Sequence, residues 1–143
     1  MPTEAIQMLV STLNRYHIPH RVPTKAGSVH KGGYSNHPCT LWVGSSTRNF
    51  YWTIDWCREM CTEYTRRYGR KHFASTQLEE IVNTLVDFPI TFTQWELTEP
   101  PKAMPDKYKH YNTCCQSYQA YLIGEKTYMA AWTFPGKRPV WWF

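Results

Sequence analysis

The sequence predicts an all-α protein, built as a single compact domain over residues 1–143 with about four helices and long ordered loops. Three observations lead to this prediction. The length of 143 residues is close to the commonest domain size. Apolar residues recur at intervals of three and four in several segments, which is the helical spacing. The chain contains no internal repeat and no linker, so nothing divides it into separate domains.

The first helix is expected to begin at the capping residue Thr3 and to end near Tyr16. Its apolar face carries Ile6, Leu9, Val10 and Leu13. Residues 17–38 follow as a long loop that is rich in Pro and Gly and holds four of the six histidines. Loops of this length in a compact domain are usually functional or mobile.

Two helices are expected after this loop. Pro38 suits the first position of a short helix over residues 39–43, which Gly44 breaks. Ser46 or Thr47 caps a long helix that runs to Tyr68 and ends at the following glycine. The stripe expected to face the core consists of Phe50, Ile54, Cys57, Cys61, Tyr64 and Tyr68.

The sequence of the second half of the chain predicts two further helices. Thr76 and Glu79 have the spacing of a capping box, which would open a helix to about residue 86 before Pro89 ends it. Residues 87–111 are expected to be mostly irregular, although the run 90–97 has strand character. The last helix is expected over residues 117–132.

The charge distribution favours an anionic partner. The net charge is +5, yet residues 72–101 hold five acidic residues and no Lys or Arg, so the rest of the chain is strongly basic. Nucleic acid or a nucleotide ligand fits this pattern. A membrane fits it less well, because no apolar run approaches spanning length and no helix is strongly basic and amphipathic.

The five cysteines favour a reducing cytosol, because an odd count and these spacings do not form a disulfide framework. Cys57 and Cys61 lie one helical turn apart and would present two thiolates near His72. No second ligand pair follows at short spacing, so we interpret both as small buried hydrophobes and expect neither a metal nor a cofactor. The chain start MPTEAIQML lacks the pattern of a signal peptide.

Several polar and aromatic residues are candidates for binding a nucleic acid or nucleotide, and each has a structural alternative. His37 is a proton donor, a reader of base edges or a helix cap. Arg48 is expected to pair with a phosphate or with Asp55. The cations near residue 70 either contact phosphate or complement the helix dipole. The candidates in this half are Lys31 beside two glycines, Asn36, His37, Trp42, Arg48, Arg66, Arg67 and Arg70.

The final third carries MPDKYK, then an aromatic helix with GEK, then RPVWW at the end, and residues 36–69 form an NHP-to-EYTRRYG block. The final third resembles the C-terminal part of the phage pyrimidine-dimer DNA glycosylases of the endonuclease V type, a family of small all-α enzymes that flip a nucleotide and cut at damaged bases. The block over residues 36–69 looks like that of a broad set of uncharacterised phage-borne proteins, which we interpret as distant relatives of the same fold. The chain resembles a distant phage-encoded relative. The resemblance implies DNA contacts at Glu125, Lys126, Arg138, Pro139 and Trp141.

The same resemblance implies a catalytic role for Glu4, because the family's first helix presents a Glu that stabilises the opened sugar. The family's attacking group is the amine of its own N-terminus. An α-amine titrates near ~8 and suits this role better than a lysine at ~10.4. Removal of Met1 would expose the secondary amine of Pro2, two residues before Glu4. The alternative is that Glu4 only complements the helix dipole.

The chain also departs from the family pattern. The family has a further helical turn and an extended segment before its Glu, so the N-terminus here is shortened, and Thr3 stands where the family has Arg. Two functions follow. One is a base-excising or base-modifying enzyme acting on DNA in the cytoplasm of a bacterial host. The other is a non-catalytic phage counter-defence protein that sequesters a nucleotide immune signal or binds a host defence protein.

Overall fold

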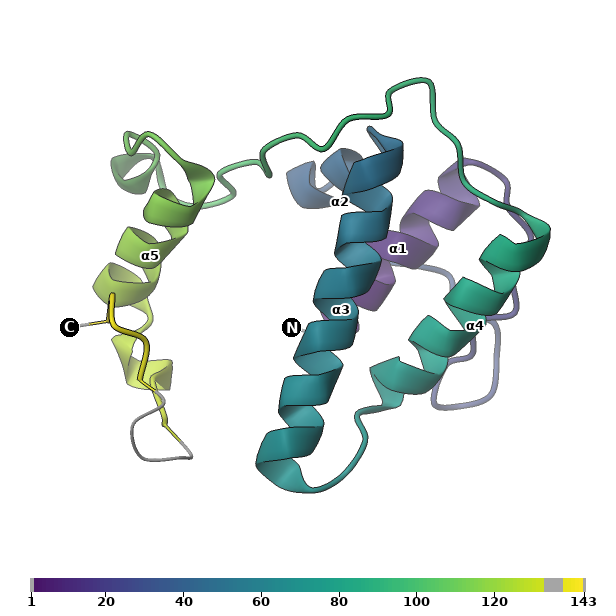
Figure 1. Cartoon of the computed structure of the whole chain (residues 1–143), viewed down its shortest axis with the longest axis horizontal. Coiled ribbons are helices and arrows are strands. Elements are labelled where there is room, and N and C mark those ends of the chain that lie inside the picture. The colour runs from purple at the N-terminus through teal and green to yellow at the C-terminus, as the bar shows by residue number, and fades with distance from the viewer. Residues whose placement is uncertain (1, 133–137, 143) are drawn as a thin grey trace. The chain divides into compact units, whose positions relative to one another are not determined.

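The protein is all-α, as predicted. The computed structural model describes residues 2–132 and 138–142, and no β-strand occurs in these ranges (Figure 1). Two compact units are found, Met1–Thr98 and Glu99–Phe143. A single domain over residues 1–143 stays a prediction. The helices are α1 (Pro2–Arg15), α2 (Pro38–Val43), α3 (Thr47–Tyr68), α4 (Phe73–Asp87) and α5 (Cys114–Glu125), with the 3-10 turns η1 (Asp106–Tyr108) and η2 (Thr127–Met129).

The core of the first unit lies where α1, α3 and α4 pack together, with α2 against α1 and α3 (Figure 1). The predicted apolar face of α1 is confirmed, since all four of its side chains are fully buried. The stripe on α3 is buried only as far as Cys61. Tyr64 is half-buried and Tyr68 is 57% exposed, because α3 extends beyond the helices that cover it.

Backbone amides in the first turn of α3 form hydrogen bonds to the segment that follows α4. Ser46 caps the helix as predicted, its hydroxyl accepting from the Asn49 amide. The amides of Thr47 and Arg48 donate to the carbonyls of Gln94 and Trp95 at 2.9 and 3.1 Å. The strand character of residues 90–97 therefore does not produce a strand. Its carbonyls are used instead to satisfy helix amides that have no partner inside the helix.

Asn49 joins three parts of the first unit through its buried side chain. Its Nδ2 donates to the carbonyl of Trp42 at 3.0 Å and to the hydroxyls of Ser45 and Thr98 at 3.1 and 2.8 Å. Its Oδ1 accepts from the Thr98 amide at 2.9 Å. Since Asn49 has no exposed surface, these bonds replace all contact of the amide with water. The end of α2, the start of α3 and the end of the unit are thereby fixed together.

The predicted boundaries of the last two helices were wrong. The α4 helix begins at Phe73 with His72 as its cap, so Thr76 and Glu79 lie inside the helix and form no capping box at its start. The α5 helix begins at Cys114, where Thr113 and Gln116 form the capping box, and it ends at Glu125. His72 was not expected to cap α4, because Ser, Thr, Asp and Asn are preferred at that position.

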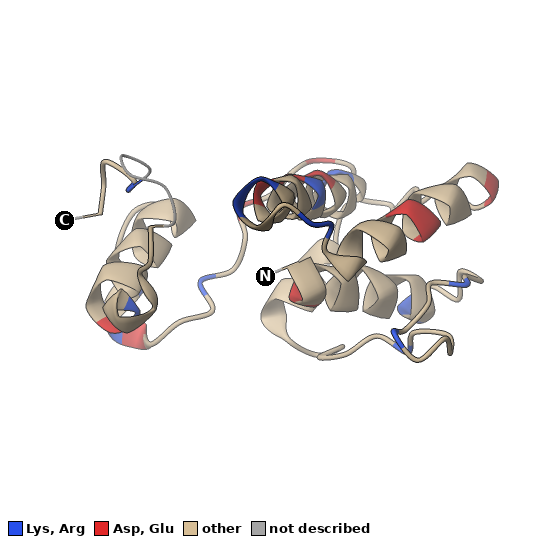
Figure 2. Ribbon diagram, turned by 90° about the horizontal axis from the view of Figure 1, so that it is seen from below, with Lys and Arg blue, Asp and Glu red and all other residues tan. Residues whose placement is uncertain are grey.

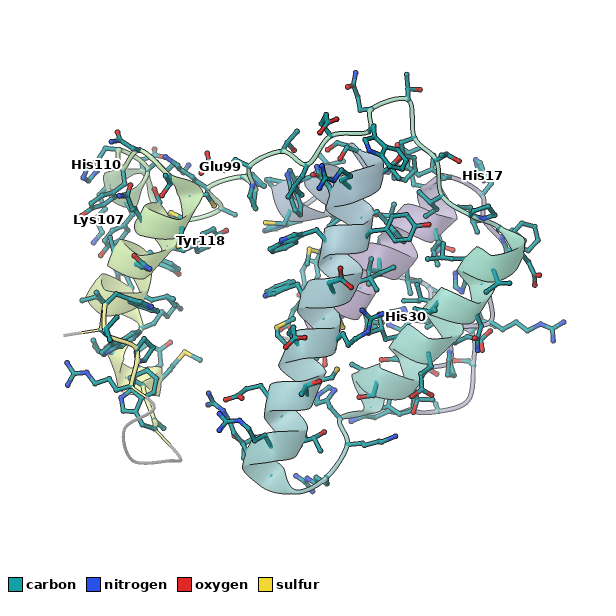
Figure 3. The ribbon with its side chains drawn as sticks, viewed as in Figure 1. His17, His30, Glu99, Lys107, His110 and Tyr118 are labelled. Carbon is teal, nitrogen blue, oxygen red and sulfur yellow. The ribbon has the colours of Figure 1, made fainter. Side chains whose placement is uncertain are left out.

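Four histidines share one local geometry. In each case Nδ1 accepts the backbone N–H of the residue two positions further along, at distances between 2.9 and 3.3 Å. A ring nitrogen accepts a hydrogen bond only when it carries no proton, so this geometry requires the neutral ring. Two of these histidines cap helices and two hold the loop after α1. The four are His20, His30 (labelled in Figure 3), His37 and His72.

We expect Asn49→Ala to lower the free energy of unfolding by roughly 2–4 kcal/mol, because several buried donors and acceptors lose their partner. Urea unfolding followed by circular dichroism measures this change. Asn83→Ala is the matched control, since Asn83 is exposed on α4. Equal stability of the two variants would contradict the role given to Asn49.

We expect stability to fall as the pH drops below about 6.5. Burial lowers the pKa of His20, His30 and His72, assisted at His20 by the charge of His30 and at His72 by Lys25 and the amino terminus. The unfolded chain titrates near ~6.5 and thus binds more protons than the folded chain in this range. Stability is therefore complete above that pH and is lost as the pH falls toward the lowered folded-state values.

The His72→Asn variant separates this effect from general acid denaturation. An Asn oxygen accepts the same amide hydrogen bond at a helix N-cap and does not titrate near neutral pH. We expect the melting temperature of this variant to match the unchanged protein at pH 7.5 and to fall less by pH 5. His110→Asn is the control, since His110 is exposed and stacks on Tyr111. An identical pH profile for both variants would show that His72 contributes nothing.

Candidate active site and nucleic-acid interface

Glu4 lies in the first turn of α1, in the position that the sequence predicted for a catalytic carboxylate. A hydrogen bond from the chain's amino terminus lowers its pKa, although partial burial opposes the shift. A backbone hydrogen bond, the charge of the amino terminus and His72 lower the pKa further. The carboxyl group is therefore ionised at neutral pH.

The surroundings of Glu4 leave few other reactive groups. The thiol of Cys57 contacts the carbonyl of Pro2 at 3.9 Å, but burial and the neighbouring Cys61 raise its pKa to about 12, so it is protonated and a poor nucleophile. His72 uses its Nδ1 to cap α4. Within the described residues, no group of three His, Cys, Asp or Glu side chains is placed to hold a metal ion.

The loop after α1 lies along the same helix. Glu4, Gln7 and Ser11 fall on one face of α1, as expected for spacings of three and four. The Ser11 hydroxyl donates to the Gly33 carbonyl at 2.9 Å and accepts from the Gly33 amide at 2.8 Å. A Cβ atom at Gly32 would collide with Ser11, so this approach requires glycine. The glycine pair is thus a docking point for the loop.

Lys31 lies in a hollow with Arg15, a residue that was not predicted from the sequence. One guanidinium nitrogen of Arg15 donates to the Ser35 carbonyl at 2.5 Å. Arg15 ends α1, where the macrodipole already explains a cation, so no sequence signal separates it from a simple helix terminus. The long loop brings Lys31 back to this helix end.

The next three candidates along the chain, Asn36, His37 and Trp42, differ in their exposure and in their hydrogen bonds. Asn36 is exposed. His37 caps α2 by accepting from the Cys39 amide at 3.1 Å, one of its three predicted roles. Trp42 is half-buried, donates its indole N–H to Thr98 at 2.9 Å and meets Trp52 edge to face. These contacts with Thr98 and Trp52 therefore fix the orientation of the Trp42 ring.

The cations of α3 have acidic partners that the sequence analysis did not assign. Arg48 pairs with Glu96 at 3.5 Å, so the expected pairing with Asp55 was wrong. Arg66 and Arg67 both bind Glu63, each at 2.6 Å. Hydrogen bonds from these two guanidinium groups lower the pKa of Glu63 to about 2. The end of α3 is therefore less cationic than its Arg and Lys residues suggest.

The candidates of the second unit are held by local contacts. Lys126 lies over the rings of Tyr121 and Tyr128, with its nitrogen 5.7 and 5.8 Å from the ring centroids. Its neighbour Glu125 is paired with Lys107 (labelled in Figure 3) at 2.6 Å. Arg138 donates to the Trp142 carbonyl at 2.5 Å, and the ring of the half-buried Trp141 packs against that of Trp142.

The family model described as pyrimidine dimer DNA glycosylase matches residues 2–76, slightly more than half of the chain. The chain belongs to the pyrimidine dimer DNA glycosylase family. This matched segment of the glycosylase-family chain spans α1, the long loop, α2, α3 and the start of α4. The searches of curated proteins and of solved structures gave no match.

The match covers Glu4 and the candidates from Lys31 to Arg70, and it supports the glycosylase-like prediction. The C-terminal motifs MPDKYK, GEK and RPVWW lie outside it, so the roles of Lys126, Arg138 and Trp141 in this glycosylase-family chain stay predictions. Among the described residues, no helix is long and apolar enough to span a membrane.

Proposed function

We propose that this protein is a DNA glycosylase that removes damaged pyrimidines and cleaves the resulting sugar, acting on DNA in the cytoplasm of a bacterial cell infected by the phage that encodes it. One observation carries the proposal. Glu4, an ionised carboxylate whose pKa is lowered by the chain's amino terminus, lies in the first turn of α1 in a chain that belongs to the pyrimidine dimer DNA glycosylase family.

The chemistry needs only these two groups. The nitrogen of the amine attacks C1′ of the deoxyribose, the bond from C1′ to the base breaks, and the base leaves with the bonding electrons and takes up a proton. The attached nitrogen gives up one proton, the bond from C1′ to the ring oxygen breaks as the sugar ring opens, and that oxygen takes up a proton to become a hydroxyl. A C1′–nitrogen double bond remains, which is a positively charged iminium when the nitrogen is that of Pro2. The amine is that of the mature N-terminus, which is Pro2 when Met1 is removed.

Glu4 serves best as an anion in this scheme. Because its pKa is lowered, the carboxylate is ionised when the sugar develops positive charge and stabilises that charge electrostatically. The same carboxylate accepts the proton that the attacking amine releases. A carboxyl group with a raised pKa would instead suit a proton donor, and no such group lies beside Glu4 among the residues whose pKa shifts are resolved.

We expect Glu4→Gln to slow covalent trapping on DNA by about 10²-fold or more, the usual effect of removing an acid–base group. The measurement is borohydride reduction of the protein mixed with a duplex that carries a pyrimidine dimer or an abasic site. Borohydride reduces the C1′–nitrogen double bond and fixes the protein to the strand. Glu59→Gln is the matched control, since Glu59 is an exposed carboxylate on α3 and does not belong to the proposed site.

Mass spectrometry of the digested adduct then identifies the nucleophile. We expect the modified peptide to contain the mature N-terminus. An adduct on a lysine peptide would refute the proposed amine, and equal trapping by Glu4→Gln and the unchanged protein would refute the role of Glu4. Tight binding of lesion DNA without any adduct would instead support the second candidate, a non-catalytic binder.

A further inference from the structure

The first unit carries a long stretch without acidic residues. From residue 5 to residue 54 the chain contains no Asp or Glu, and it contains five cations. This stretch forms most of α1, the long loop, α2 and the start of α3. In Figure 2 the loop after α1 carries Lys and Arg but no acidic residue, whereas acidic residues lie on α4. None of the residues that line the hollow described next is acidic, although Glu80 and Asp87 of α4 lie beside His20 and Arg21 of the loop.

Part of this stretch forms a hollow of about 420 Å³ between α1 and the loop. Arg15 and Lys31 line it, together with Ser35 and the pair Gly32 and Gly33. Polar atoms form somewhat more of its lining than apolar atoms do, and they include hydroxyl, amide and cationic groups. Its chemistry fits an oxyanion with several acceptor oxygens rather than an apolar ligand.

The hollow is held open by specific bonds. Asn14 donates to the Lys31 carbonyl at 3.1 Å, and Ser11 holds Gly33 from both sides. Glycine at 32 adopts φ +82°, which other residues rarely adopt. The loop therefore stays against α1, and Gly32 lets its backbone approach Ser11 closely.

Donors remain available around the hollow. The Lys31 ammonium makes no hydrogen bond or ion pair with any residue that the structure describes, and Arg15 uses one of its five N–H groups. The Ser35 hydroxyl and backbone amide likewise have no partner among the described residues. Two cations, a hydroxyl and an amide are the usual components of a phosphate site.

We propose that this hollow binds a phosphate group, supplied by the backbone of the DNA strand on which Glu4 acts. The proposal rests on the proposed function for its ligand source. From residue 4 to residue 15 the helix rises by about 16 Å at ~1.5 Å per residue. At ~3.4 Å per nucleotide along a duplex, that distance corresponds to about five nucleotides. The hollow therefore holds the strand several nucleotides from the lesion.

The test measures binding to a duplex with a tetrahydrofuran abasic analogue, which has no leaving base, at several salt concentrations. We expect Lys31→Gln and Arg15→Gln each to reduce the slope of log affinity against log salt by about one unit, because each phosphate contact releases about one counterion. Lys31→Gln is the cleaner variant, since that side chain has no structural partner in the described part of the chain.

Arg21→Gln is the matched control, because Arg21 lies in the same loop, is exposed and does not line the hollow. We expect it to leave the slope unchanged. Unchanged slopes for Lys31→Gln and Arg15→Gln would overturn the proposal. An equal decrease for Arg21→Gln would also overturn it, since the loop would then act only through its general charge.

Competition with inorganic phosphate and with dAMP identifies the source of the phosphate. Competition by dAMP below millimolar concentration, abolished by Lys31→Gln, would support the phosphate site but assign it to a free nucleotide. Failure of the two proposals is distinguishable, because the analogue measures binding alone. A normal borohydride adduct together with unchanged salt-dependence slopes would refute the phosphate site but not the glycosylase activity. Reduced slopes without an adduct would refute the glycosylase activity but not the phosphate site.

Discussion

The buried side chain of Asn49 is the interaction on which the first unit depends. Its amide nitrogen donates to the Trp42 carbonyl at the end of α2. The same side chain also bonds to Thr98, the last residue of that unit, and so holds it against the start of α3. One amide thereby joins the end of α2, the start of α3 and the end of the first unit. Since a buried amide without partners is costly, these segments either assemble together or lose this arrangement together. Asn49 helps to place the end of α2, which also packs against α1.

The distribution of unpaired charge, rather than the number of cations, defines where an anion binds. The cluster near residue 70 is conspicuous in the sequence, yet Glu63 holds two of its guanidinium groups. Exposed pairs of this kind contribute little stability, but they reduce the local field. Arg15 and Lys31 form no visible cluster in the sequence, but they line the same hollow and lie in a stretch without any acidic residue. We therefore place recognition of phosphate on the loop side of α1.

The sequence predicted the elements whose signals are local. Pro38, Ser46 and Gly69 set the ends of α2 and α3 correctly, because caps act within one helical turn. Prediction from the sequence failed where the local structure depends on a segment far away in the chain. Residues 90–97 satisfy the start of α3 instead of forming a strand, and Arg15 meets Lys31 only because the loop folds back. Glu4 was predicted from a family resemblance, and periodicity alone would have left it a helix-dipole residue.

The choice of nucleophile follows from the groups that surround Glu4. The Cys57 thiol, with its pKa near 12, is protonated at any physiological pH and is excluded. A lysine amine at its ordinary value near ~10.4 is neutral in only about one molecule in a thousand at pH 7.4. At the same pH an α-amine near ~8 is neutral about two hundred times more often. The neutral histidines that hold the loop and cap α4 require the same neutral to mildly alkaline range, so folding and the proposed chemistry favour the same pH.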